Sequence, residues 1–115
     1  SPPFEIIASI KLRRAAAADG GLWMRVRKHV YYSGTVQGVG CRDTARSLAR
    51  DANVTGFVKN LSDGRVELVV EGGAAIVERY LADVAAAMGQ YIGRAETIDE
   101  TPTEEFDAFR VAVDW

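Results

Sequence analysis

The sequence predicts an α+β fold in which two helices cover one face of a small mixed sheet. Two stretches with helical periodicity lie among runs of β-preferring residues, in the order β-α-β-β-α-β-β. The pair Asp63-Gly64 lies between two apolar runs, which is a strong signal for a hairpin between adjacent strands. With 115 residues, 48% of them hydrophobic, the chain has the size of one domain and enough apolar side chains for a packed core.

Five runs rich in β-branched and aromatic residues are predicted to be strands, and they cover residues 24–36, 54–60, 65–70, 91–98 and 106–113. In the third run, Val66, Leu68 and Val70 alternate with Arg65, Glu67 and Val69, as expected for a strand with one buried face. The Glu-Gly-Gly sequence at 71–73 is expected to end this strand. A polar connection at 99–105 precedes the last strand.

Two stretches place apolar residues on one helical face. The helix predicted over 41–52 has a stripe formed by Cys41, Ala45, Leu48, Ala49 and Ala52. The helix predicted over 74–88 has a stripe formed by Val77, Tyr80, Leu81, Val84 and Met88. Two right-handed β-α-β units joined by the hairpin at 61–64 give a split β-α-β, ferredoxin-like sandwich with an extra short strand.

Residues 1–23 differ from the rest of the chain, because Pro2-Pro3, the run Ala15–Ala18 and Gly20-Gly21 give no strand alternation. We therefore expect two regions: an N-terminal leader or extension at 1–23, loosely attached, and a domain at 24–115. One hypothesis is that Met24 is the natural start; the alternative is a genuine extension. Mass spectrometry of the protein from its native source would separate them, because an intact segment 1–23 contradicts the first.

The amino-acid composition argues against several classes of protein: disulfide-rich, His/Cys metal-binding, membrane-spanning and extended nucleic-acid-binding proteins. The single cysteine, Cys41, excludes an internal disulfide framework and points to the cytoplasm, and one cysteine with one histidine cannot build a His/Cys metal site. No apolar run approaches the roughly 20 residues of a membrane span, and the first residues lack the pattern of a signal peptide. Residues 1–60 carry a net charge of +6 and residues 61–115 carry −8. The acidic half argues against a long nucleic-acid track.

The stretch from Gly34 to Arg42 has the features of an anion-binding turn. It leads from a predicted strand into a predicted helix, whose first N–H groups have no intrahelical partner and carry partial positive charge. Gly38 and Gly40 let the backbone approach a ligand closely. The turn is neither a Walker loop, since no Gly-Lys-Ser/Thr follows, nor the dinucleotide fingerprint, since Asp43 replaces the third glycine.

Two motifs resemble the signatures of the acylphosphatases. The first is Gly34-x-Val36-Gln37-Gly38-Val39-x-x-Arg42, and the second is Gly56-Phe57-Val58-Lys59-Asn60, at the spacing found in that family. The resemblance covers about residues 26–115. It implies a split β-α-β fold and hydrolysis of small-molecule acyl phosphates to a carboxylate and inorganic phosphate, without a metal or cofactor. Separately, we expect the protein to be a monomer.

The resemblance also implies the roles of individual residues. The phosphoryl group would be held by backbone N–H groups of the loop, and Arg42 would clamp its oxygens with a planar fork that suits bidentate recognition. Asn60 would orient the attacking water, since an amide donates and accepts hydrogen bonds but cannot remove a proton. The loop residues expected to bind substrate are Gln37, Gly38, Val39, Gly40 and Cys41.

The sequence departs from the family pattern near the arginine. Cys41 stands where a phenylalanine is usual, and we interpret it as a small core residue rather than a reactive thiol. Ala45 stands where a threonine is frequent, with Thr44 one place earlier, and Asp43 could compete with phosphate for Arg42. His29 lies away from both motifs and is interpreted as structural or exposed.

Two alternatives remain open, and the departures at Cys41 and Ala45 motivate the first of them. One is an acylphosphatase-like module that binds phosphate or carbamoyl phosphate for regulation and turns over poorly. The other is a nucleic-acid-binding module of similar topology, suggested by Tyr31-Tyr32, although the Lys/Arg-Gly-Phe-x-Phe run of such modules is absent from 65–70.

Overall fold

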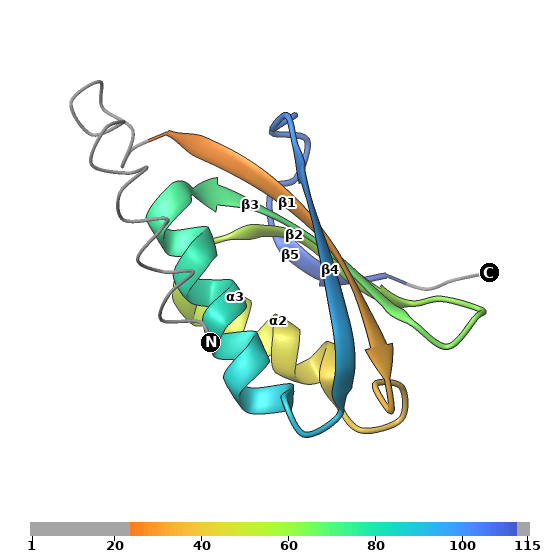
Figure 1. Ribbon diagram of the computed structural model, residues 1–115. Helices are drawn as coiled ribbons and strands as arrows, with labels where there is room; N and C mark the ends of the chain where they lie inside the picture. The colour runs from red at the N-terminus through yellow and green to blue at the C-terminus, as the bar shows by residue number, and fades with distance from the viewer. Residues whose placement is uncertain (1–23, 113–115) are drawn as a thin grey trace.

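The computed structural model describes residues 24–112, in which two helices pack on one face of a five-stranded sheet (Figure 1). The predicted boundary at 23/24, Val113 and the rest of both ends lie outside the described residues. The elements, in chain order, are β1 (Arg25–Gly34), α2 (Cys41–Ala52), β2 (Thr55–Asn60), β3 (Val66–Gly73), α3 (Ala74–Met88), β4 (Ile92–Glu100) and β5 (Phe109–Val111).

The strands follow the order β4-β1-β3-β2-β5. β1 pairs antiparallel with β3 and β4, β2 pairs antiparallel with β3, and β2 pairs parallel with β5. This arrangement confirms the predicted ferredoxin-like α+β sandwich with a mixed sheet and an extra short strand. Both helices have the predicted bounds, because each carries a clear apolar stripe that must face the sheet.

The core lies between the helices and the sheet. In the three central strands, β1, β3 and β2, alternate residues belong to the buried core, as the period of two in a strand requires, whereas β4 is largely exposed. The helices contribute Ala45 and Ala49 from α2 and Val77, Tyr80 and Val84 from α3. The core side chains of α2 are small, and those of α3 are larger.

Several predicted strand bounds were wrong. β1 ends at Gly34 rather than at 36, and β4 runs through Glu100 into the connection predicted at 99–105. β3 continues through Gly73 instead of ending at Val70, with Gly72 paired to Val26. A Cβ on Gly72 would lie 3.3 Å from side-chain atoms of Val54 and Val77, so the glycine allows close packing here rather than breaking the strand. The last strand begins at Phe109 rather than at 106, because Phe106 instead packs against Phe57 on the open face of the sheet.

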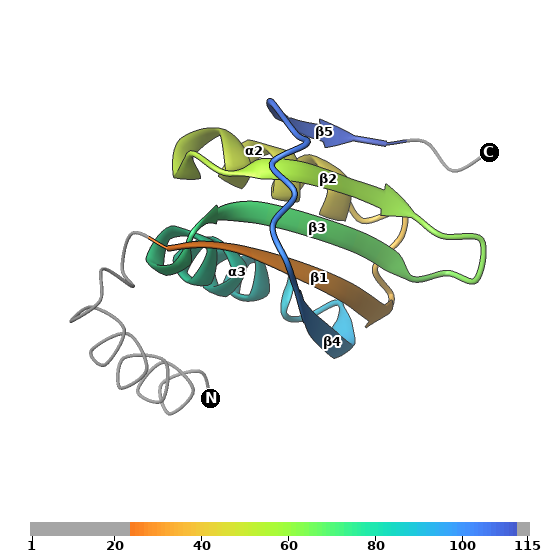
Figure 2. The same cartoon turned by 90° about the horizontal axis from the view of Figure 1, so that it is seen from above.

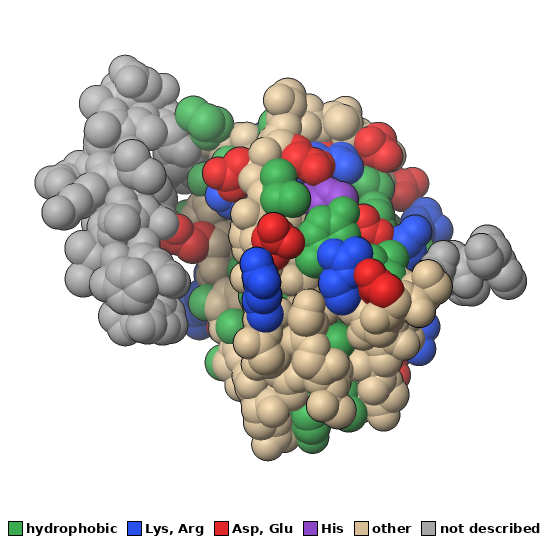
Figure 3. All heavy atoms as spheres, turned by 45° about the vertical axis from the view of Figure 1, so that its right-hand side comes forward, with side chains coloured by type: hydrophobic (Ala, Val, Ile, Leu, Met, Phe, Trp, Pro, Cys, Tyr) green, Lys and Arg blue, Asp and Glu red, His purple; other side chains and the backbone are tan. Residues whose placement is uncertain are grey.

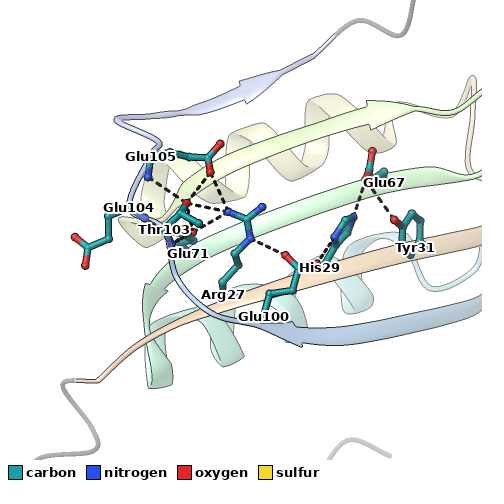
Figure 4. A network of polar contacts seen from close by, with 9 residues as sticks. All are labelled: Arg27, His29, Tyr31, Glu67, Glu71, Glu100, Thr103, Glu104 and Glu105. Carbon is teal, nitrogen blue, oxygen red and sulfur yellow. Dashed lines mark hydrogen bonds and ion pairs between the residues drawn. The ribbon is translucent and has the colours of Figure 1, made fainter.

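The face of the sheet opposite the helices is crossed by residues 101–108, which join β4 on one edge to β5 on the other (Figure 2). Glu71 lies under this segment and is fully buried. Its carboxylate accepts hydrogen bonds from the N–H groups of Thr103 (3.0 Å) and Glu104 (2.9 Å) and from Arg27 Nη1 (3.0 Å) (Figure 4). One buried carboxylate therefore fixes the crossing segment to the sheet.

His29 lies on the same face, where acidic and basic side chains are intermixed with hydrophobic ones (Figure 3). Its ring contacts Glu100 Oε2 through Nδ1 at 2.8 Å and Glu67 Oε2 through Nε2 at 2.6 Å, and it stacks on Tyr31. The histidine therefore joins β1 to both neighbouring strands, which agrees with its interpretation as structural. Within residues 24–112, none of the helices is long and apolar enough to cross a membrane.

Candidate active site

The predicted anion-binding turn connects β1 to α2 at one end of the sheet. Gly38 and Gly40 have φ angles of 80° and 82°, in the left-handed region that favours glycine. Gly40 is the N-cap of α2, so no side chain caps the first turn, and its carbonyl accepts the first helical hydrogen bond from Thr44 N–H at 2.9 Å. The free N–H groups of that turn are therefore available to an anion.

A cavity of about 310 Å³ opens beside this turn. Five of the seven predicted site residues line it, namely Gly38, Gly40, Cys41, Arg42 and Asn60. The other two, Gln37 and Val39, belong to the same turn but are not among the lining residues. The remaining lining residues are Val36, Asp43, Arg46 and Val111. Two sequence motifs from separate elements thus meet at one small-molecule-sized cavity.

Arg42 is the second residue of α2 and is partly exposed. Among the described residues, its guanidinium has no ion pair and no side-chain hydrogen bond. The neighbouring Asp43 instead lies 3.7 Å from Arg46 Nη2. Asp43 therefore pairs with Arg46 and not with Arg42, and the Arg42 guanidinium is free to bind an anion.

Asn60 is the last residue of β2. Its Oδ1 is buried and has no hydrogen-bond partner within the described part of the chain. An unpartnered buried amide oxygen is costly, because the group gives up its hydrogen bond to water and gains none in return. Whichever way the amide is turned, Oδ1 or Nδ2 offers a polar group to a ligand or a water molecule in the cavity.

Gln37 has a different role from its neighbours. Its Nε2 donates to the backbone carbonyls of Leu61 (2.8 Å) and Arg65 (2.9 Å), on the two sides of the β2–β3 turn. Leu61 directly follows Asn60, so this side chain ties the loop before Arg42 to the strand end that carries Asn60. The sequence pattern could not show this contact, because it joins segments that are 24 and 28 residues apart.

Cys41 and Ala45 lie behind the loop, on the buried face of α2. The side chain of Cys41 is 3% exposed, and burial raises the pKa of its thiol although the charge of Arg42 opposes the effect. This confirms its interpretation as a core residue. Ala45 is fully buried, and its carbonyl accepts a hydrogen bond from the Tyr80 hydroxyl at 2.8 Å. α3 thereby supports α2 where the sequence lacks the threonine.

Arg46 and Val111 are lining residues that the sequence interpretation missed. Arg46 lies four residues after Arg42, a spacing that places both on one side of a helix, so a signal for it was present in the sequence. Val111 reaches the cavity because β5 pairs parallel with β2, which only the fold reveals. Across residues 24–112, no group of three or more His, Cys, Asp or Glu side chains is placed to hold a metal ion.

Comparisons with known proteins point to one family. The sequence model of the family described as Acylphosphatase matches residues 28–111. An acylphosphatase of Roseiflexus sp. is 42% identical over 88 residues, covering 74% of this chain and 92% of that protein. An acylphosphatase of Chloroflexus aurantiacus is 42% identical over 75% of this chain and 95% of that protein. The solved structure of an acylphosphatase from Coxiella burnetii has a TM-score of 0.68 at 32% identity, covering 76% and 93% of the two chains.

Proposed function

Because the chain belongs to the acylphosphatase family, we propose that it hydrolyses acyl phosphates to a carboxylate and inorganic phosphate in the cavity between the loop 37–41, Arg42 and Asn60. One observation supports this assignment most strongly: the cavity is lined both by Arg42, whose guanidinium is unpaired, and by Asn60, whose buried amide oxygen has no hydrogen-bond partner among the described residues. Neither group has a structural partner in the described chain, and together they offer one site for a phosphoryl group and one for a water molecule.

The phosphoryl group binds at the N-terminus of α2. Backbone N–H groups of residues 37–41 donate to its oxygens, and the dipole of α2 adds partial positive charge there. Arg42 supplies the full charge, and its planar fork binds two oxygens at once. Because these donors are held by the fold before substrate arrives, they stabilise the charge that develops during phosphoryl transfer.

Asn60 positions the attacking water. Its amide oxygen accepts one hydrogen bond from the water, which orients a lone pair of the water oxygen toward phosphorus. As the new oxygen–phosphorus bond forms, the bond between phosphorus and the acyl oxygen breaks, and the carboxylate leaves with the electron pair. The proton of the water passes to a phosphoryl oxygen of the substrate, because asparagine cannot take it. Acyl phosphates allow this because a carboxylate is a good leaving group.

The alternative of a regulatory phosphate- or carbamoyl-phosphate-binding module is not favoured. The relatives named as acylphosphatases match over 92% and 95% of their own length, and both motif residues, Arg42 and Asn60, line the cavity. We further propose a monomer in the cytoplasm that acts on small molecules and not on nucleic acid. The free buried thiol of Cys41 and the net charge of −8 on residues 61–115 support this proposal.

Hydrolysis of benzoyl phosphate tests the proposal. We expect turnover in the presence of EDTA, and a loss of at least about a hundredfold in kcat/KM for Arg42→Ala and for Asn60→Ala, since each removes a group that acts at the reacting centre. Arg42→Lys keeps the positive charge but loses the planar guanidinium that binds two oxygens. We expect its activity to lie between that of Arg42→Ala and that of the wild type. Arg50→Ala, an exposed arginine of the same helix outside the cavity, is the matched control and retains activity.

Two results would overturn parts of this proposal. Full activity of Asn60→Ala would refute the proposal that Asn60 positions the attacking water. Absence of turnover in the wild type, with calorimetry showing inorganic phosphate bound in an Arg42-dependent manner, would instead establish the binding module.

A further inference from the structure

We propose that Arg46 selects acyl phosphates whose acyl group carries a carboxylate at its far end. The inference rests on the proposed function and adds to it the recognition of the half of the substrate that does not react. It assigns a task to a cavity-lining side chain that takes no part in binding the phosphoryl group.

Arg46 is placed to reach the acyl half. Arg42 and Arg46 are four residues apart on α2 and both line the cavity, so their side chains follow one another along one side of the helix. Arg42 is partly buried at the first turn, next to the loop, and Arg46 is exposed one turn further along. A substrate held by its phosphoryl group at the first turn can therefore extend along α2 toward Arg46.

Arg46 contributes little to the stability of the described part of the chain. Its side chain is 48% exposed, and its one ion-pair partner there is Asp43, at 3.7 Å, whose side chain is 81% exposed. Exposed pairs of this kind contribute little to stability. Arg27 is the contrast, since its guanidinium is 14% exposed and meets the carboxylates of Glu71, Glu100 and Glu105. The guanidinium of Arg46 is therefore available to a ligand.

The remaining lining of the cavity favours a charged acyl group over a large apolar one. Its apolar side chains are Val36, Cys41 and Val111, and the first two are almost fully buried behind the loop. An apolar acyl chain thus gains little contact at the outer end, whereas an anionic one meets a guanidinium that can bind it through two hydrogen bonds. Because Asp43 offsets part of the charge of Arg46, the outer end suits a singly charged carboxylate better than a second phosphate.

The test compares succinyl phosphate with butyryl phosphate, two four-carbon acyl phosphates that differ in a terminal carboxylate or methyl group. The readout is the ratio of the two kcat/KM values, measured on the full chain. We expect the wild type to favour succinyl phosphate, and Arg46→Gln to reduce that ratio about three- to tenfold, mainly through KM, because one solvent-exposed charge pair is lost. Arg46→Lys should retain part of the preference. Raising the salt concentration should lower the preference of the wild type, because exposed charges are screened.

Two variants on the same helix sharpen the comparison. Arg50→Gln removes an equal charge one turn further along, outside the cavity, and should leave the ratio unchanged. Asp43→Asn removes the offsetting carboxylate and should raise the ratio above that of the wild type. A urea titration of each variant confirms that the fold is intact, which is expected for substitutions of exposed side chains.

The outcomes separate this inference from the proposed function. If the wild type hydrolyses neither substrate, the proposed function fails. If it hydrolyses both, but Arg46→Gln changes the ratio no more than Arg50→Gln does, the hydrolase stands and the role of Arg46 is refuted.

Discussion

Arg27 Nη1 and Glu71 Oε2 lie 3.0 Å apart beneath the segment that crosses the open face of the sheet (Figure 4). Glu71 is fully buried, and a carboxylate is tolerated there because both of its oxygens accept hydrogen bonds. Two of those donors are backbone N–H groups of the crossing segment, and Glu104 there has a φ of 57°, an uncommon value for a residue other than glycine. The buried carboxylate thus holds a turn that would otherwise relax.

We expect Glu71→Gln to lower the free energy of unfolding by about 2–4 kcal/mol, because the amide loses an acceptor and leaves Arg27 partly unpaired. Urea denaturation at neutral pH measures this change. Glu104→Gln is the matched control, since its side chain is 66% exposed on the same segment, and it should change stability by less than about 0.5 kcal/mol. Equal effects of the two substitutions would contradict the role given to Glu71.

The same carboxylate makes stability depend on pH. Burial alone would raise the pKa of Glu71, but hydrogen bonds from Thr103, Arg27 and Glu104 outweigh it and hold the pKa below its ordinary value. The stabilisation is therefore complete above the pKa of an unfolded glutamate, about 4.3, and is lost as pH falls through the lower pKa of the folded state. We expect the unfolding free energy of the wild type to fall more steeply on acidification than that of Glu71→Gln. Parallel curves for the two proteins would refute this assignment.

The side chain of Gln37 offers a test of positioning, because its amide is bonded to the β2–β3 turn and does not line the cavity. Gln37→Ala removes both bonds from Nε2 to the turn, so the loop and Asn60 lose their fixed separation. We expect kcat to fall about tenfold or more while the inhibition constant of inorganic phosphate changes little, because the loop amides and Arg42 remain. Ser62→Ala, exposed in the same turn, is the control. A loss confined to phosphate binding would show that Gln37 acts on binding instead.

The N-caps of the two helices form a natural pair for testing backbone strain. Gly40 has a φ of 82° and Gly73 a φ of −62°, and added Cβ atoms would clash with nothing at either position. Gly40→Ala should lower the unfolding free energy by about 1–2 kcal/mol, the cost of left-handed backbone for a side-chain-bearing residue. Gly73→Ala should change it by less than about 0.5 kcal/mol. Thermal denaturation of both variants measures the two changes. Similar losses of unfolding free energy would mean that the left-handed backbone at Gly40 is not the cause.

Cys41 is expected to be unreactive in the native protein. Its thiol is buried, and burial raises its pKa, so both access and the thiolate fraction are low. With Ellman's reagent we expect labelling at least about a hundredfold slower in buffer than in concentrated guanidinium chloride, because the native thiol reacts only during opening. Rapid native labelling would instead favour the reactive-thiol interpretation.

The sequence predicted the fold and most of the residues now found to line the cavity, because the signals used for them are local. The stripe of Ala45 and Ala49 and the glycines before Arg42 can each be recognised within a dozen residues. The end of β3 was misjudged for the opposite reason: Gly72 is small because Val54 and Val77 approach it, and that approach exists only in the folded chain. Propensity alone cannot distinguish a glycine that ends a strand from one that makes room for a neighbour.

The polar contacts of the open face also could not be predicted. Arg27, His29, Glu67 and Glu71 resemble a solvated face in the sequence, because alternating charges are typical of exposed strands. Arg27 and Glu71 join a network because residues 101–108 return across the sheet and supply donors to Glu71. His29 meets Glu67 because β1 pairs with β3. The same holds for Gln37, whose partners depend on the register of the β2–β3 hairpin.

The parallel pairing of β5 with β2 has a consequence for how the site is completed during synthesis. Loop 37–41, Arg42 and Asn60 leave the ribosome within one continuous stretch of the chain, and Val111 emerges only after them. A nascent chain that has reached β4 already carries each polar group proposed to act on substrate, yet its cavity is open on one side. During translation, Arg42 and Asn60 are therefore synthesised before β5, which carries Val111 and closes one side of the cavity.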